Sequence, residues 1–149
     1  MTEDQNPKQY DLEERTFEFA QRIRAFVKRL RLTLANIEDI KQVVKASGSL
    51  GANYIEANEA LSKKDFVMRI KISRKESKES RYWLRLVDTG DQNEAEQERG
   101  SLIQESTELM KINLWLNPAK KRVMVSNIGI LNFAFVSDFE IRISDFGWQ

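Results

Sequence analysis

The sequence predicts an all-α protein, an antiparallel up-down-up-down four-helix bundle with a C-terminal tail that is β-prone or disordered. Two observations support this class: apolar residues recur in steps of three and four along four segments, and capping or stop signals separate these segments. The 149 residues suffice for one domain with its own core. We expect residues 1–10 to form a disordered leader, residues 11–117 the bundle, and residues 118–149 an atypical C-terminal extension.

The composition excludes several classes of site. Charged residues make up 32% of the chain and the formal net charge is +1, which indicates neither disorder nor a globally basic nucleic-acid binder. The chain has no cysteine and no histidine, so thiolate ligands, disulfides and the commonest general base are absent. No enzymatic activity, metal or cofactor is therefore expected. The N-terminus is polar and no apolar run could span a membrane, which predicts a cytoplasmic protein with no membrane partner.

The first helix is predicted from an apolar series that begins at Leu12 and continues at Thr16, Phe19, Ile23, Phe26 and Leu30. Phe17, Ala20 and Val27 would widen this stripe to the width of a core-facing surface.

The second helix is expected to begin after Asn36, a plausible N-cap. Its series is Ile37, Ile40, Val44, Ser47, Gly51 and Tyr54, in which small residues replace large ones halfway along. Each glycine in a helix costs about 1 kcal/mol relative to alanine. Close helix packing is the favoured explanation for Ser47, Gly48 and Gly51; a kink is the alternative, and a phosphate-binding loop is a third idea that lacks the usual flanking strand and lysine.

The third helix is predicted from about Lys63 to Asp88, after a capping pair formed by Ser62 and Asp65, and ends near Gly90. Its series is Phe66, Ile70, Ser73, Ser77, Ser80, Leu84 and Val87, and a second stripe contains Met68, Ile72, Glu79, Tyr82, Trp83 and Leu86. The serines mirror the small residues of the second helix, so Ser73 and Ser77 are expected at a close helix contact.

Three glutamates and one asparagine are expected beside that contact. Asn53, Glu56, Glu76 and Glu79 are interpreted as polar groups of helix packing or assembly, with the carboxylates partly buried and satisfied by neighbouring side chains. A two-metal carboxylate site is the alternative, but such sites in bundles use Glu-x-x-His pairs.

A fourth helix is predicted from about Asp91 to Leu116, through Ala95, Leu102, Ser106, Leu109 and Leu116, and Pro118 ends it. Beyond this proline, β-branched and aromatic residues dominate. The segment could be an added hairpin, an interaction strand, or the product of a shifted or extended reading frame.

The charges are unevenly distributed along the chain. Residues 15–31 and 63–85 are rich in lysine and arginine, whereas residues 88–108 are acidic. Either two basic helices form a nucleic-acid surface, or the basic and acidic surfaces neutralise each other within or between subunits. Charge alone selects Arg22, Arg29, Lys71, Lys75 and Lys78 as candidate contacts to nucleic acid.

The run from Ser47 to Asp88 resembles the family of small bacterial four-helix bundle proteins known as 23S rRNA intervening-sequence proteins. The resemblance rests on Ser49, Asn53, Glu56, Ser62, Asp65, Phe66, Glu76, Glu79, Trp83 and Leu84, and it extends over about Asp11 to Ile112. It implies a bundle that assembles into a homo-oligomeric ring, typically a pentamer, without catalytic residues. A related branch, the accessory proteins of diversity-generating retroelements, binds nucleic acid and a reverse transcriptase.

Three hypotheses of function follow. The leading one is a non-enzymatic, self-assembling bundle that binds RNA, DNA or a nucleic-acid enzyme. The alternative is a protein-interaction scaffold ring with no nucleic-acid role. An enzyme that uses Glu56, Glu76 and Glu79 is the third and weakest idea.

Overall fold

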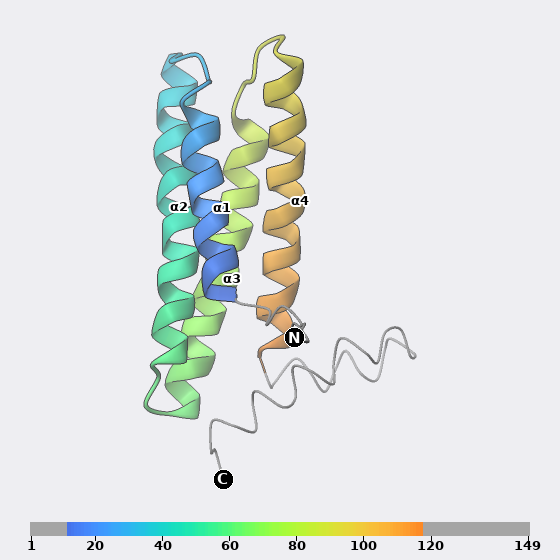
Figure 1. Ribbon diagram of the computed structural model, residues 1–149. Helices are drawn as coiled ribbons and strands as arrows, with labels where there is room; N and C mark the ends of the chain where they lie inside the picture. Colours follow the sequence, from blue (N-terminus) through green and yellow to red (C-terminus); the bar gives the residue numbers. More distant parts are fainter. Residues whose placement is uncertain (1–11, 118–149) are drawn as a thin grey trace, which may run out of the picture.

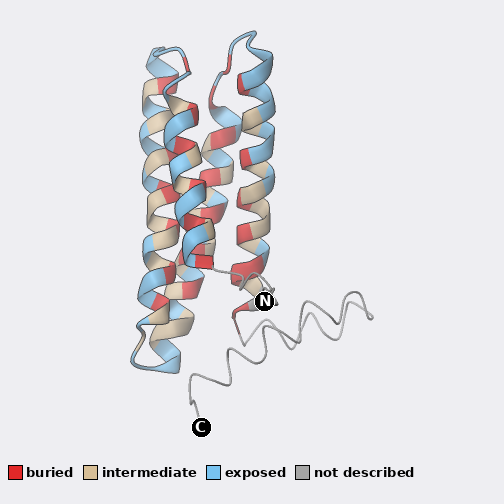
Figure 2. Ribbon diagram, viewed as in Figure 1, coloured by how far each residue is buried: buried red, intermediate tan, exposed pale blue. Residues whose placement is uncertain are grey.

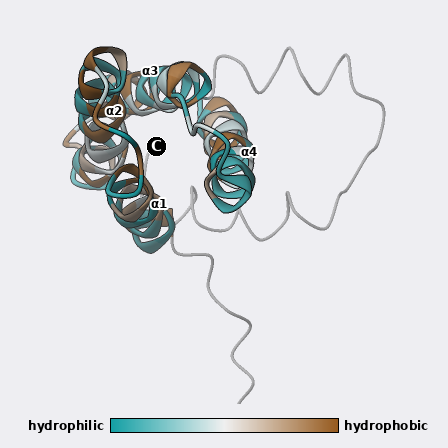
Figure 3. Ribbon diagram, turned by 90° about the horizontal axis from the view of Figure 1, so that it is seen from above, coloured by the Kyte–Doolittle hydropathy of each residue, from teal (hydrophilic) through white to brown (hydrophobic). Residues whose placement is uncertain are grey.

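The computed structural model describes residues 12–117, which form four α-helices. They are α1 (Leu12–Val27), α2 (Leu34–Asn58), α3 (Lys63–Leu86) and α4 (Asn93–Trp115). Consecutive helices pack on one another and α4 closes back on α1, so that α1 and α3 occupy opposite corners (Figure 3). The α1–α2 and α3–α4 loops lie at one end and the α2–α3 loop at the other (Figure 1), which is the predicted up-down-up-down bundle.

The core lies along the bundle axis, and three of the four predicted seams are confirmed (Figure 2). On α1, all of the series from Leu12 to Leu30 is buried. Phe17, however, is 54% exposed, so the predicted widening of this stripe is wrong at that position. The α3 and α4 seams are buried at every expected position except Phe66, which is partly buried against the core.

The buried face of α2 is rotated by one residue from the prediction. Its most buried side chains include Val43, Leu50 and Ala57, while Val44 and Gly51 lie at the flank. Ser47 and Tyr54 are buried as expected. The error has a physical cause: α2 carries apolar residues on both flanks, and a polar residue, Asn36, occupies the first position of the true seam.

Asn36 was predicted to cap α2, but it is instead a buried residue of the helix that hydrogen-bonds to two loops. Thr33 caps α2 by accepting a hydrogen bond from the backbone N–H of Asn36. The Asn36 Nδ2 donates to the carbonyls of Arg31 and Asp88, both at 2.9 Å, and its Oδ1 accepts from the backbone N–H of Asp88. A buried amide satisfied in this way fixes the α1–α2 loop against the α3–α4 loop.

Small residues allow α2 and α3 to pack closely, and this pair makes the most extensive helix contact in the bundle. Ser73, Ser77 and Ser80 are fully buried on α3, and Ser73 Oγ donates across the contact to the Leu50 carbonyl at 3.1 Å. Ser62 caps α3 by accepting from the backbone N–H of Asp65, as predicted.

The two glycines of α2, Gly48 and Gly51, face α1. A Cβ at Gly51 would lie 3.2 Å from Thr16 Oγ1, closer than side chains normally pack, and one at Gly48 would lie 3.5 Å from Arg24 Nη2. This part of α2 therefore makes two contacts within one chain. Ser47 and Leu50 are buried on one side, and Gly51 lies against α1 on the other. The close approach of Thr16 explains Gly51 without a kink or a ligand loop, whereas a Cβ at Gly48 would make only an ordinary contact.

The expectations for the leader and for the β-prone extension fall on residues 1–11 and 118–149, outside the described residues. Within 12–117, no helix is long and apolar enough to cross a membrane.

Candidate nucleic-acid interface

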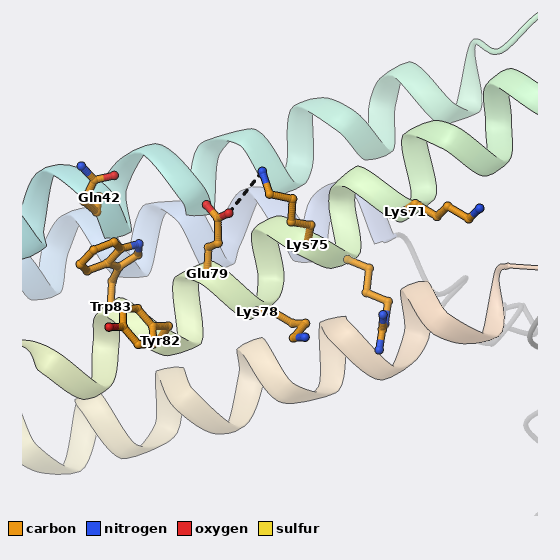
Figure 4. A pocket seen from close by; sticks show the side chains of 8 residues that line it. Gln42, Lys71, Lys75, Lys78, Glu79, Tyr82 and Trp83 are labelled. Carbon is orange, nitrogen blue, oxygen red and sulfur yellow. Dashed lines mark ion pairs between the residues drawn. The ribbon is translucent and has the colours of Figure 1, made fainter.

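An open groove of about 540 Å³ runs along the outer face of α3 and brings together three of the five predicted basic contacts (Figure 4). Lys71, Lys75 and Lys78 lie at intervals of four and three residues, which places them on one side of the helix. The remaining lining residues are Gln42, Arg74, Glu79, Tyr82 and Trp83.

The cations of this groove are largely unpaired. Among residues 12–117, no carboxylate lies within ion-pair distance of Lys71, Arg74 or Lys78. Lys75 is the exception, since its Nζ lies 3.3 Å from Glu79 Oε1 and 3.8 Å from Glu76 Oε1. The groove lining thus has four cations and one carboxylate, which gives it a positive potential.

Glu76 is the partly buried carboxylate that the sequence suggested. Its side chain is only 13% exposed. Burial raises the pKa of Glu76 above the ordinary glutamate value, and the neighbouring Glu79 carboxylate acts in the same direction, while Lys75 and Lys45 oppose them. Glu76 therefore lies beside the cationic groove, where its carboxylate partly neutralises the charge of Lys75.

Two aromatic side chains stand at one end of the row of lysines. Tyr82 and Trp83 pack edge to face with ring centroids 5.0 Å apart, and Tyr82 is 55% exposed. Figure 4 places Gln42 of α2 beside Trp83, and Lys71 at the opposite end of the groove. A face that combines cations, an exposed ring and an amide has the groups that proteins use to contact nucleic acid.

A second groove continues the first toward the start of α3. It shares Lys71 and Lys75 with the first groove and adds Lys64, Met68 and Ile72 among its lining residues. Together the two grooves follow α3 from its first turn to Trp83, so the surface suits an elongated ligand.

The two other basic candidates lie elsewhere. Arg22 Nη2 pairs with Glu98 Oε1 at 3.0 Å and donates to Ser101 Oγ at 2.8 Å, so it joins α1 to α4. Arg29 is exposed in the α1–α2 loop. Neither lies on α3, and α1 stands diagonally across the bundle from it (Figure 3).

Sequence reasoning missed four residues of the groove lining: Gln42, Arg74, Tyr82 and Trp83. Tyr82 was assigned to a second apolar stripe of α3, but in the structure Met68, Tyr82 and Leu86 of that stripe are all about half exposed. The signal was present in the lysines that interrupt this stripe, because a core-facing stripe carries few cations.

The remaining polar candidates form a separate cluster on α2 and α3. Asn53 Nδ2 donates to the Ser49 carbonyl at 2.8 Å, and Arg69 Nη1 donates weakly to Asn53 Oδ1 at 3.4 Å. Glu56 is 59% exposed and pairs with Arg69 Nη2 at 3.5 Å, so its expected burial is wrong. Across residues 12–117, no three acidic side chains gather closely enough to hold a metal ion.

The fold and this surface define a class of protein: a four-helix up-down bundle whose third helix presents a cationic groove. A family model described as "23S rRNA-intervening sequence protein" matches residues 8–114. This match covers most of the chain, and the protein belongs to that family.

A solved structure supports the same assignment. The chain is similar, at 30% identity and a TM-score of 0.58, to a protein of unknown function from the S23 ribosomal protein family of Bacteroides thetaiotaomicron VPI-5482. The match covers 71% of this chain and 97% of the other. The comparison with curated proteins found no match.

Proposed function

We propose that this protein is a non-enzymatic, self-assembling bundle that binds RNA through the outer face of α3. The observation that carries the proposal is the row of cations at Lys71, Arg74, Lys75 and Lys78, three of which lack an ion-pair partner within residues 12–117.

The electrostatics favour a polyanion over a small anionic ligand. The groove is open and long, and its cations recur along one helix face instead of converging on a point. Phosphates that replace condensed counterions along such a row give affinity that depends on salt and little on sequence.

Binding of a fluorescent structured RNA, measured by anisotropy at several salt concentrations, tests the proposal. The Lys71→Gln/Lys75→Gln/Lys78→Gln variant removes three contacts, and the slope of log K against log salt should then fall by about 2 to 3 in magnitude. The matched control is Lys28→Gln/Lys41→Gln/Lys111→Gln, which changes the net charge equally at exposed sites outside the groove. Equal loss in both variants would mean that only overall charge matters.

Glu79→Gln provides the opposite change. It removes the one carboxylate of this groove's lining and the shorter of the two ion pairs of Lys75, so RNA affinity should rise by a few fold. Unaltered affinity would place the RNA elsewhere.

Self-assembly into a homo-oligomeric ring is the second part of the proposal. Several large apolar side chains outside the two grooves remain exposed on one chain: Phe17, Leu32, Leu34, Ile55 and Leu61. Contact with a second copy would remove them from water. Ser47 and Gly51 already pack against other parts of the same chain, so assembly would use these outer residues. Light scattering with and without nuclease tests this, and a monomer at about tens of micromolar, a concentration at which micromolar contacts form, would contradict it.

A further inference from the structure

The structure points to a specific class of RNA for this surface: we infer that the groove takes single-stranded RNA, with an unpaired base stacked on Tyr82. This inference rests on the proposed RNA binding and narrows it. Three observations carry it, namely the exposed ring of Tyr82, its position at the end of the lysine row, and the presence of Gln42 in the lining at the aromatic end of the groove.

The first step concerns the ring itself. Tyr82 is 55% exposed in an otherwise cationic surface, and Trp83 holds it edge to face at 81° between the ring planes. A partly exposed ring that a second ring supports can receive a base on its free face. Stacking of this kind tolerates any base, because every base has a π face.

The second step concerns the path of the backbone. Lys78 lies one helical turn from Tyr82, and Lys75 and Lys71 follow at further turns of about 5–6 Å each along α3. A strand with one base on Tyr82 would therefore lay its successive phosphates along these lysines. The charges extend along a nearly straight helix, and they do not require the two facing backbones of a duplex.

The third step concerns the base edge. Gln42, on α2, lines the same groove at the end where Trp83 lies, away from Lys71 (Figure 4). Its amide offers both a donor and an acceptor. The Watson–Crick edge of a base is open to such contacts only when the base is unpaired, because a duplex uses this edge for its own hydrogen bonds.

Another occupant of this face would be an acidic segment of a protein, either a second copy or a different chain. The apolar residues of the second groove, Val67, Met68 and Ile72, would suit such a segment. The aromatic and amide end of the first groove favours a nucleotide instead, so the experiment separates these two occupants.

The experiment compares three labelled RNA probes in anisotropy titrations at one low salt concentration. They are an unstructured single strand of about 12 nucleotides, within the usual size range of single-strand sites, a blunt duplex of equal length, and the same single strand with its bases removed. The wild-type protein should bind the first probe more tightly than the other two.

Tyr82→Ala should weaken binding of the intact single strand by about 5- to 100-fold. Its affinities for the duplex and for the abasic strand should stay within about twofold of the wild-type values, because neither probe offers an unpaired base to stack on the ring. Tyr82→Phe, which keeps the ring, should bind like the wild type. Because Tyr82 is half exposed, circular dichroism melting should show that all three proteins are folded.

Each outcome has a defined meaning. If Tyr82→Ala binds all three probes like the wild type, while the triple lysine variant loses binding, the stacking inference is overturned and the proposed RNA binding stands. If the wild type binds none of the probes, both are overturned. If Tyr82→Ala instead lowers the oligomer mass in light scattering with RNA binding intact, the face is an interface between protein chains.

Discussion

The helices α1 and α3 stand at opposite corners of the bundle and both carry many basic residues, yet these residues do different things. On α1, Arg15 and Arg22 are paired with Glu105 and Glu98 of α4. On α3, Lys71, Arg74 and Lys78 have no such partner within residues 12–117. Similar stretches of sequence thus give a structural contact at one corner and an available surface at the other.

The difference follows from how each helix is held in place. Buried serines let α3 pack closely on α2, and the Arg69–Glu56 ion pair between these helices lies at the exposed edge of the contact. The contact between α1 and α4 is the smaller one, and two arginine–glutamate pairs reinforce it at its edge. Where close packing of small residues holds a helix, most of its outer charges are available for another role.

The largest expected effect comes from disturbing the packing of α3. Ser73 is fully buried and donates to the Leu50 carbonyl, so Ser73→Leu both overfills the contact and removes a hydrogen bond. The free energy of unfolding should fall by about 2–4 kcal/mol, measured by urea denaturation. Ser73→Ala is the control and should cost about 1 kcal/mol. If the leucine variant were as stable as the alanine variant, close packing would not be what holds α3.

The seams of α1, α3 and α4 could be predicted from the sequence because each carries its apolar residues on a single stripe. The seam of α2 could not be placed to the residue, since its apolar residues flank both sides and Asn36 interrupts the pattern. The role of Asn36 depends on Asp88, which lies 52 residues away. No local pattern predicts such a contact.

The candidate surface was predictable in part for the same reason. Lys71, Lys75 and Lys78 share a face through their spacing alone, which the sequence contains. Arg22 meets Glu98 only because α1 and α4 pack in a particular register along their axes, and this register is defined by the folded chain. Glu56 was expected to be partly buried beside Glu76, but it lies on the exposed flank of α2.

The next effect concerns the ion pairs of α1. Arg15 donates from Nε and Nη2 to the two carboxylate oxygens of Glu105, the second bond at 2.9 Å, and both side chains are about three-quarters buried. A double-mutant cycle with Arg15→Gln and Glu105→Gln should give a coupling energy of about 1 kcal/mol. High salt should reduce it. A coupling energy near zero would mean that α1 needs no ion pair at this corner.

Arg22→Gln makes the comparison sharper, because Arg22 was itself a candidate contact to RNA. Its pair with Glu98 is more exposed, so the stability loss should be about 0.5 kcal/mol. The RNA affinity of Arg22→Gln should stay within about twofold of the wild-type value. Each single substitution of Lys71, Lys75 or Lys78 by glutamine should reduce RNA affinity by more than that. If Arg22→Gln weakened RNA binding as much as Lys78→Gln, pairing within the chain would not distinguish the two surfaces.

The smallest effect concerns the acidic edge of α3. Because burial raises the pKa of Glu76 above the ordinary value of 4.5, the folded protein binds a proton more readily than the unfolded chain does. Stability therefore falls as the pH rises through the interval between the unfolded and the folded pKa, and it stays lower above that interval. Glu76→Gln removes this cost, so the variant should be more stable than the wild type at neutral pH, and the gain should shrink at acidic pH, where the carboxyl group becomes protonated.

Urea denaturation of the wild type and Glu76→Gln at pH 4 and pH 7 measures this gain. The exposed Glu38→Gln serves as the control and should show no comparable gain at neutral pH. A loss of stability in Glu76→Gln at pH 7 would mean that the attraction of Glu76 to Lys75 and Lys45 outweighs its burial. In that case a carboxylate would stabilise α3 as Glu105 stabilises α1, and the contrast between the two corners would lie only in which cations remain unpaired.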